Sequence, residues 1–500
     1  MNVRLMYPAR DFDPRRELPP EHVALARDLD LDVLVEAMAG GDPLVRDVCR
    51  AALLQGAHND PPTVRYRQAV LRDALGHREL VRVLYDLAGD VIDRRKKEWL
   101  GVFSRSPAGI LAEASALLQM YIGMLRRLRH VLEASPGEFV SEGWTGLVGL
   151  VTEELDDAFF ADAERSLTEL RESTTMSASA SLGEGGVGRN YMLLRGSGRG
   201  PRWLLSMAQR GPNTFRVGSA DDGASRVLSD MRNVTVAPVA DLLARAAQGV
   251  KEFFEALRVE LAFYVGSLNL HARLEALGVP VCFPATHETG VSTLRFSRLV
   301  DATLALRTRD VVVGNSLDLG GKQVTIITGA NQGGKTVFVR SLGVAQLLLQ
   351  SGLFVTADAF EGEAVRGLYT HFRREEDETL TSGKLDEELE RLSDIVECLR
   401  PHALVLFNES FAATNEREGS EVARQVIAAL EARKVRVVFV THLYVFAQGL
   451  FEQEDARRAF LRAQRRPDGT RSYQLKPGEP QATSFAEDLY REILADALEP

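Results

Sequence analysis

Residues 329–336 have the types and spacing of a loop that binds phosphate. They read GANQGGKT and match the pattern G-x-x-x-x-G-K-[ST], between the strand-like run KQVTIIT and the helix-like run TVFVRSLGVAQLLLQ. Glycines in such a loop let backbone N–H groups wrap phosphates, and the following helix directs its positive end at them. The alternative is a chance match, which the strand-loop-helix context disfavours. The pattern therefore predicts a nucleotide site.

The predicted loop supplies both contacts and charge. Lys335 is expected to neutralise the β and γ phosphates of ATP, and the Thr336 hydroxyl to bind Mg²⁺. ATP and Mg²⁺ are thus the expected cofactors. The predicted nucleotide-binding residues of the loop are Gly329, Ala330, Asn331, Gln332, Gly333, Gly334, Lys335 and Thr336.

A second apolar run, HALVLFNES, ends in Asn408 and Glu409. The carboxyl ends of strands are where open α/β sheets bind ligands. Glu409 could orient and deprotonate an attacking water. Asn408 can reach a metal through a bound water, but it brings no negative charge to offset Mg²⁺. The alternative is that Asn-Glu only caps a loop.

A third run, VRVVFVTH, places His442 directly after a β-branched strand. An imidazole at this position could reach a γ-phosphate. A lone histidine at a strand end is also common as a polar loop residue.

The bulk composition is typical of a globular protein without a membrane span or secretion signal. The chain has 500 residues, enough for roughly two to four domains. The first thirty residues contain no long apolar run, and the three cysteines show no metal-binding spacing. These features predict a cytoplasmic protein that does not contact a membrane.

Two basic clusters are candidate DNA contacts, although the net charge is −10. Phosphate contacts depend on local rather than summed charge. The first, RRKK, comprises Arg94, Arg95, Lys96 and Lys97, and the second, RRLRH, spans 126–130. The alternative is that both are solvated helix faces.

The sequence changes its pattern near residue 278. From 22 to 170, apolar residues recur at helical spacing. Ser106 and Pro107 are expected to begin a helix of about 28 residues, and another helix is expected over about 147–172.

The Ser- and Gly-rich stretch 173–201 predicts a loop or hairpin. NVTVAP (233–238) predicts a short strand, and residues 238–277 predict a long helix. After 278, helices alternate with apolar strands, including GLFVTA (352–357), which predicts a parallel sheet.

Together these motifs resemble the ATPase domain of the MutS family of DNA mismatch repair proteins, a branch of the ABC-type ATPases. The resemblance lies in TIITGANQGGKT, VVVGNSLDL, LVLFNESFAATNEREG, FVTHLYVFAQ and PGEPQATSFAEDL, in this order over about 290–494. More weakly, TVRYRQAVLRDALGHRELVRVLY resembles the family's core segment.

The resemblance implies a multidomain protein: an all-α core and lever region followed by a C-terminal α/β P-loop ATPase domain. The expected domains are an extension at 1–21, core and levers at 22–277 with a short clamp-like insertion at about 173–237, and the ATPase at 278–500. A short form without the mismatch-recognition and connector domains is implied, because about 25 residues precede the core.

The resemblance also implies roles for particular residues. Glu409 is the catalytic carboxylate and His442 the γ-phosphate sensor, while Val312 lies near the place of the adenine ring. Ser382 or Gly383, in TSGKLDEEL, takes the place of a signature that completes the partner subunit's site. A homodimer and DNA binding in repair or recombination follow, and other repair or recombination proteins are candidate partners.

Asn408 stands where the family has Asp, which predicts slow ATP hydrolysis. The rival hypothesis is a nucleotide-gated protein-interaction module with little turnover and no direct DNA binding, which suits the acidic charge balance. A third, an ABC transporter ATPase subunit, is disfavoured by the long helical N-terminal half.

Overall fold

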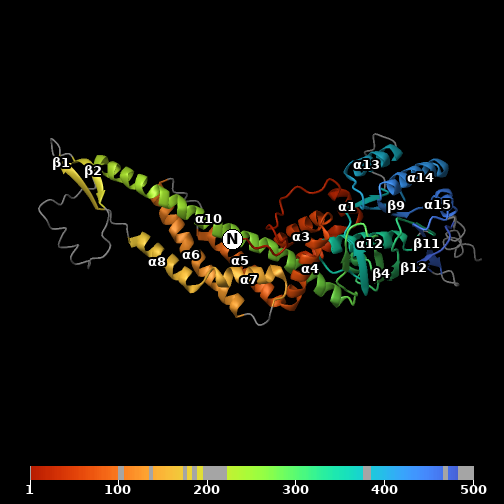
Figure 1. The fold of residues 1–500 in the computed structure, drawn as a ribbon, viewed down its shortest axis with the longest axis horizontal. Helices are drawn as coiled ribbons and strands as arrows, with labels where there is room; N and C mark the ends of the chain where they lie inside the picture. Colours follow the sequence, from red (N-terminus) through yellow and green to blue (C-terminus); the bar gives the residue numbers. More distant parts are fainter. Residues whose placement is uncertain are drawn as a thin grey trace, which may run out of the picture. The chain divides into compact units, whose positions relative to one another are not determined.

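The structure is a computed structural model that describes most of the chain. The described residues are 2–98, 106–134, 139–172, 177–182, 188–194, 222–330, 332–374, 384–465 and 471–481. They form a large unit of Val3–Arg82, Glu138–Thr145 and Val259–Pro500, and a small unit of Met1–Asn2, Val83–Gly137 and Gly146–Arg258. Figure 1 shows the fold and labels many of the elements by the names used below. The domain boundaries expected from sequence remain a prediction.

The small unit is built from long helices and one strand pair. Ser106 caps α6 as expected, because its hydroxyl accepts from the Gly109 N–H at 3.2 Å. β1 and β2 pair antiparallel, which matches the hairpin expected in the Ser- and Gly-rich stretch. The unit contains parts of α5 (Arg78–Glu98), α7 (Glu142–Glu153) and α10 (Asp222–Ala276), and all of α6 (Pro107–Glu133), α8 (Asp157–Glu172), β1 (Ser177–Leu182) and β2 (Gly188–Leu194).

Two expectations for this region are wrong. The helix expected over about 147–172 is interrupted between α7 and α8, where the Asp156 carboxylate accepts from the Phe159 N–H at 2.7 Å and so starts a new helix. The strand expected at 233–238 lies inside α10, which continues through Pro238. A short β-branched run does not distinguish strand from helix, and the continuous helix prevails here.

One described helix, α6, is long and apolar enough to cross a membrane by length and composition alone. Core helices of soluble proteins pass the same test. Several of its side chains, including Tyr121 and Leu128, are buried within the small unit.

In the helical part of the large unit, α3 approaches α10 closely. A Cβ placed on Gly266 of α10 would lie 2.3 Å from the Cys49 sulfur of α3, so only glycine allows this approach. Besides the ends of α5, α7 and α10, this part contains α1 (His22–Asp28), α2 (Leu31–Ala39), α3 (Pro43–Gly56) and α4 (Pro61–Gly76).

A six-stranded sheet forms the centre of the C-terminal α/β region. Its order is β12-β11-β6-β10-β9-β8, and every neighbouring pair is parallel except β11 with β12. The carboxyl ends of the parallel strands therefore lie along one edge. The strands are β6 (Val324–Thr328), β8 (Leu368–Phe372), β9 (Leu404–Asn408), β10 (Arg436–Val440), β11 (Arg458–Arg465) and β12 (Arg471–Pro477).

Helices cover both faces of this sheet. Phe407 belongs to an apolar cluster with side chains of α13 (Lys384–Cys398), α14 (Glu416–Ala432) and α15 (Tyr444–Phe451). Leu406 points to the other face, where a Cβ on Gly343 of α12 (Lys335–Gln350) would lie 2.7 Å from it. The expected helical N-terminal region and C-terminal α/β region are thus both present (Figure 1).

A smaller sheet of order β3-β7-β4-β5 lies in the same unit. The expected parallel strand at 352–357 is wrong: only Val355 forms a bridge, with Cys282, and the apolar side chains Leu353 and Phe354 are buried as a loop. The elements here are β3 (Ala285–His287), β4 (Leu294–Leu299), α11 (Ala302–Thr308), β5 (Asn315–Asp318) and β7 (Ala359–Glu363).

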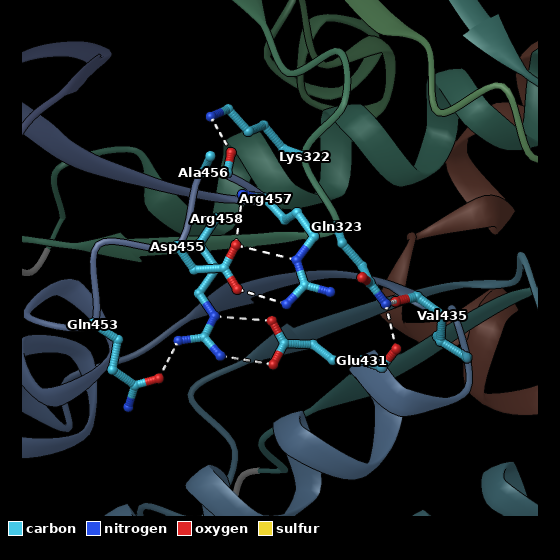
Figure 2. Close-up of polar contacts among 9 residues, drawn as sticks. All are labelled: Lys322, Gln323, Glu431, Val435, Gln453, Asp455, Ala456, Arg457 and Arg458. Carbon is cyan, nitrogen blue, oxygen red and sulfur yellow. Dashed lines mark hydrogen bonds and ion pairs between the residues drawn. The ribbon is translucent and has the colours of Figure 1, made fainter.

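Polar contacts fix β6 and β11 at the amino end of the main sheet (Figure 2). Arg458 of β11 donates two bonds of 2.9 Å to the Glu431 carboxylate of α14, and both side chains are largely buried. The Gln323 side chain donates to the Glu431 carbonyl at 2.7 Å. These contacts hold the strands in register and leave the opposite, carboxyl edge free for polar loops.

Candidate nucleotide-binding site

The loop between β6 and α12 has the backbone shape that its glycines allow. Gly329 and Gly334 have φ values of +119° and +88°, in the region that side chains rarely adopt. A Cβ on Gly333 would also lie 2.8 Å from the Ala463 methyl of β11. Gln332 has φ 58°, and Asn331 lies outside the described residues. The loop ends at Gly334, which caps α12 at its amino end.

Lys335 points its ammonium group back into the loop. Its Nζ donates to the carbonyl oxygens of Gly329 at 2.7 Å and Ala330 at 2.9 Å. Burial lowers the pKa of this lysine to about 8, against the opposing effect of the Glu409 carboxylate. A buried cation held only by neutral carbonyls is well placed to pair with an incoming anion.

Thr336 and Asn408 bring two oxygen atoms together. The Thr336 hydroxyl donates to the Asn408 Oδ1 at 3.1 Å. Hydroxyl and amide oxygens are the kind of hard ligand that Mg²⁺ accepts, although neither is charged. Among the described residues, no group of three or more His, Cys, Asp or Glu side chains could hold a metal ion. A Mg²⁺ ion bound beside Thr336 and Asn408 would therefore need further oxygen ligands from a bound molecule, such as the phosphates of a nucleotide.

Glu409 and His442 follow neighbouring strands β9 and β10 and face each other. The His442 Nε2 lies 3.0 Å from the Glu409 Oε1, and the Glu409 N–H donates to the Val440 carbonyl at 2.8 Å. The hydrogen bond from His442 holds the pKa of the Glu409 carboxyl below its usual value, with further help from Lys335 and Arg373. Glu409 has φ 57°, an unusual conformation for a residue with a side chain.

A cavity of about 410 Å³ is lined by Lys335, Thr336 and Glu409, whereas Asn408 and His442 contact these side chains without lining it. Its polar side contains Lys335, Thr336 and Glu409, and its other side is largely apolar. The predicted Val312 lines it, together with the loop residues Gln332, Gly333 and Gly334 and with Leu304, Thr308, Asp310, Val311, Val313, Asn315, Val337 and Tyr473.

Sequence reasoning missed Tyr473 as a lining residue. It lies on β12, has φ 58°, is 48% exposed and lines the cavity. Asn315 fixes this strand by accepting from the Leu475 N–H at 2.7 Å. The sequence shows that residue 473 is aromatic, but it does not predict the strand pairing that brings Tyr473 to the loop, because that pairing is a long-range contact.

The remaining predicted residues lie outside this cavity or outside the described residues. Ser382 and Gly383 lie outside the described residues. Arg94 is exposed on α5 and Arg95 half-buried, and the backbone of Lys96 and Lys97 continues the helix. These four belong to the small unit, and the cavity residues belong to the large unit.

Comparisons with known proteins match two parts of the chain. The family model described as MutS2 N-terminal domain matches residues 59–277, and the one described as MutS domain V matches 325–485. Proteins called Endonuclease MutS2 from Geobacillus sp. (strain WCH70), Thermus thermophilus and Carboxydothermus hydrogenoformans are 34%, 33% and 29% identical over 149, 172 and 235 residues. These segments cover 29%, 34% and 46% of this chain but only 19%, 23% and 29% of the relatives.

Proposed function

The chain belongs to the MutS family, and we propose that it binds ATP in the cavity beside α12 and hydrolyses it slowly, as an ABC-type ATPase. The observation that carries this proposal is that Lys335 and Glu409, from different elements, line one cavity. The proposal does not extend to nuclease activity, since the matched segments span less than a third of the relatives whose names include it.

Phosphate binding follows from the loop. An incoming triphosphate takes the Lys335 ammonium away from the Gly329 and Ala330 carbonyls, because a charged acceptor forms the stronger hydrogen bond. The N-terminal N–H groups of α12 add their positive end. The purine ring then lies on the apolar side, against Val312 and the Tyr473 ring.

Mg²⁺, when bound, offsets the phosphate charge and polarises the γ-phosphate. The Thr336 hydroxyl and the Asn408 amide oxygen fit its ligand preference, Asn408 acting through a bound water. Asn408 supplies no charge, so we expect weaker metal binding and slower turnover than a carboxylate would give.

Glu409 orients the attacking water and accepts its proton. Because its pKa is lowered, this carboxylate is a weak base, and positioning is its main contribution. His442, bonded to the same carboxylate, is placed to touch the γ-phosphate. The experiment is ATP turnover by the purified chain with the Glu409→Gln variant as its matched control, since that substitution keeps shape and removes the charge.

We further propose that two copies associate through their nucleotide sites, with Ser382 or Gly383 of each copy completing the site of the other. The dimer would bind duplex or branched DNA through its backbone and act in repair or recombination, with Arg94, Arg95, Lys96 and Lys97 as phosphate contacts. Three free cysteines suit a reducing cytoplasm.

DNA binding is tested by affinity for duplex and branched DNA across salt concentrations. Phosphate contacts predict a steep fall with salt, and the double variant Arg94→Gln/Arg95→Gln should reduce the slope. The rival function, a nucleotide-gated module that binds a protein partner, is favoured by the net charge of −10. Absence of DNA binding at low salt would support that rival and contradict the DNA proposal.

A further inference from the structure

The turn that follows β9 has an unusual backbone. Glu409 and Phe411 have φ values of 57° and 64°, in the left-handed region where a Cβ is unfavourable. Ser410 and Phe411 are fully buried. Because this turn sets the direction of the Glu409 side chain, the contacts that hold it also set the position of the carboxylate.

Glu388 of α13 holds one end of the turn. Its Oε2 accepts from the Phe411 N–H at 2.8 Å, and the residue is only 6% exposed. Burial raises the pKa of this carboxyl, against the opposing effects of its bond to the Phe411 N–H and of the Arg391 and Arg373 charges. The carboxylate satisfies a buried N–H that the left-handed turn leaves without a strand partner.

His371 of β8 holds the middle of the turn. Its Nδ1 lies 2.7 Å from the Ser410 hydroxyl and its Nε2 lies 3.0 Å from the Glu388 carbonyl. Its ring also stacks on Phe411, with centroids 5.7 Å apart and planes at 26°. The imidazole therefore touches both the turn and the helix that carries Glu388.

The protons of this cluster can be assigned from its acceptors. A carbonyl can only accept, so the His371 Nε2 carries a proton and donates to Glu388. Burial lowers the pKa of His371 to about 4, so the ring is neutral at physiological pH. The single proton of the Ser410 hydroxyl is then shared between the His371 backbone carbonyl, at 2.6 Å, and the His371 Nδ1. The cluster thus works as a fixed set of hydrogen bonds around neutral pH.

We propose that Glu388 and His371 are positioning residues for Glu409, and that they connect helix α13 to the catalytic carboxylate. This inference rests on the proposed ATPase function. Neither residue lines the nucleotide cavity. Their loss should therefore lower turnover through the direction of Glu409, while nucleotide binding stays intact.

The test compares Glu388→Ala, Glu388→Gln and the control Glu390→Ala, an exposed residue on the same helix. Three quantities are measured on the full chain: the affinity for a fluorescent ATP analogue, kcat at saturating ATP and Mg²⁺, and hydrogen exchange of the segment 407–412. Ser410→Ala serves as a second probe, because it deletes one hydroxyl and should fold even where Glu388→Ala does not.

For Glu388→Ala we expect kcat to fall at least about tenfold, with affinity unchanged within about twofold. The Phe411 amide should exchange faster. Glu388→Gln should restore both values, because an amide oxygen also accepts from the Phe411 N–H. Ser410→Ala should lower kcat in the same direction with unchanged affinity.

Equal kcat in Glu388→Ala and Glu390→Ala would overturn the inference. A kcat of Glu388→Gln as low as that of Glu388→Ala would overturn it as well. Equal losses of kcat and affinity would show a general structural role instead. If the unsubstituted protein fails to hydrolyse ATP, the proposed function fails. Unchanged exchange at Phe411 in Glu388→Ala would separately refute the role of Glu388 in holding the turn.

Discussion

The hydroxyl of Thr336 donates to the Asn408 Oδ1 at 3.1 Å, so the amide oxygen lies beside the expected metal ligand. What Asn408 lacks, compared with a carboxylate, is charge and not an oxygen in position. Metal affinity is therefore the property that this residue should alter most.

Asn408→Asp should lower the Mg²⁺ concentration needed for half-maximal ATPase activity, by about tenfold, because a negative charge near the cation strengthens binding. A Mg²⁺ titration at fixed ATP measures it. Asn415→Asp makes the same chemical change at the cap of α14, where Asp is an equally good cap, and should leave the midpoint unchanged. Equal midpoints for Asn408→Asp and the unsubstituted protein would contradict this role.

Lys335→Ala should weaken ATP binding roughly 30-fold or more, since a charged hydrogen bond of about 2 kcal/mol is removed. Binding of a fluorescent ATP analogue measures the effect. Lys322→Ala is the matched control, because Lys322 donates to the Ala456 carbonyl at the opposite edge of the sheet, where Figure 2 shows it. A similar affinity in both variants would argue against phosphate binding at this loop.

ATP binding should take up protons near pH 8. Lys335 has a pKa of about 8 in the free protein, and a bound polyanion raises the pKa of a neighbouring ammonium. Affinity should thus be constant below about pH 7 and decrease as the pH rises above 8. Calorimetry in two buffers of different ionisation enthalpy at pH 8 counts the protons. Zero uptake there would mean that Lys335 does not meet the phosphates.

Replacing His442 with Asn should move the acid limb of the rate profile to higher pH. The hydrogen bond from His442 lowers the pKa of Glu409, and burial, which raises that pKa, remains when the imidazole is removed. The carboxylate then takes up a proton at a higher pH and turnover falls there. The pH dependence of kcat for both proteins measures the shift, and an unmoved limb would show that Glu409 is not the titrating base.

Glu260 should make the large unit less stable as pH rises. Its carboxylate accepts from the N–H groups of Leu5, Met6 and Phe12 at 2.5, 3.1 and 2.6 Å, and burial raises its pKa to about 7. The folded state then binds a proton more tightly than the unfolded chain does. This contribution to the free energy of unfolding is about 3 kcal/mol. It is complete below pH 4.5, the pKa of an unperturbed glutamate, and is lost as the pH rises to about 7.

The comparison for this prediction is Glu260→Gln, which cannot titrate. Its unfolding free energy, from urea denaturation between pH 4.5 and 8, should lack this pH-dependent component. Parallel pH curves for both proteins would exclude Glu260 as the source.

Much of the site could be predicted from short stretches of sequence. Lys335 and Thr336 lie within one contiguous motif, and Glu409 and His442 each end an apolar strand, so local pattern alone brings them to one edge of the sheet. The cap of α6 at Ser106 is local too. Such features depend on neighbours within a few residues.

What sequence did not predict depends on long-range contacts. Tyr473 joins the cavity because β12 pairs beside β11, and Glu388 meets Phe411 across 23 positions of chain. Neither pairing leaves a periodic signal. The strand expected at 233–238 failed for the opposite reason: Val234, Thr235 and Val236 favour strands locally, while the long helix α10 continues through them.

The central claim is that Glu409 directs water at an ATP held by Lys335. Single-turnover hydrolysis by the unsubstituted protein and by Glu409→Gln, both saturated with ATP and Mg²⁺ after their affinities are shown to match, tests it most directly. The account predicts a rate at least about tenfold higher for the unsubstituted protein. Equal rates at equal occupancy would contradict it.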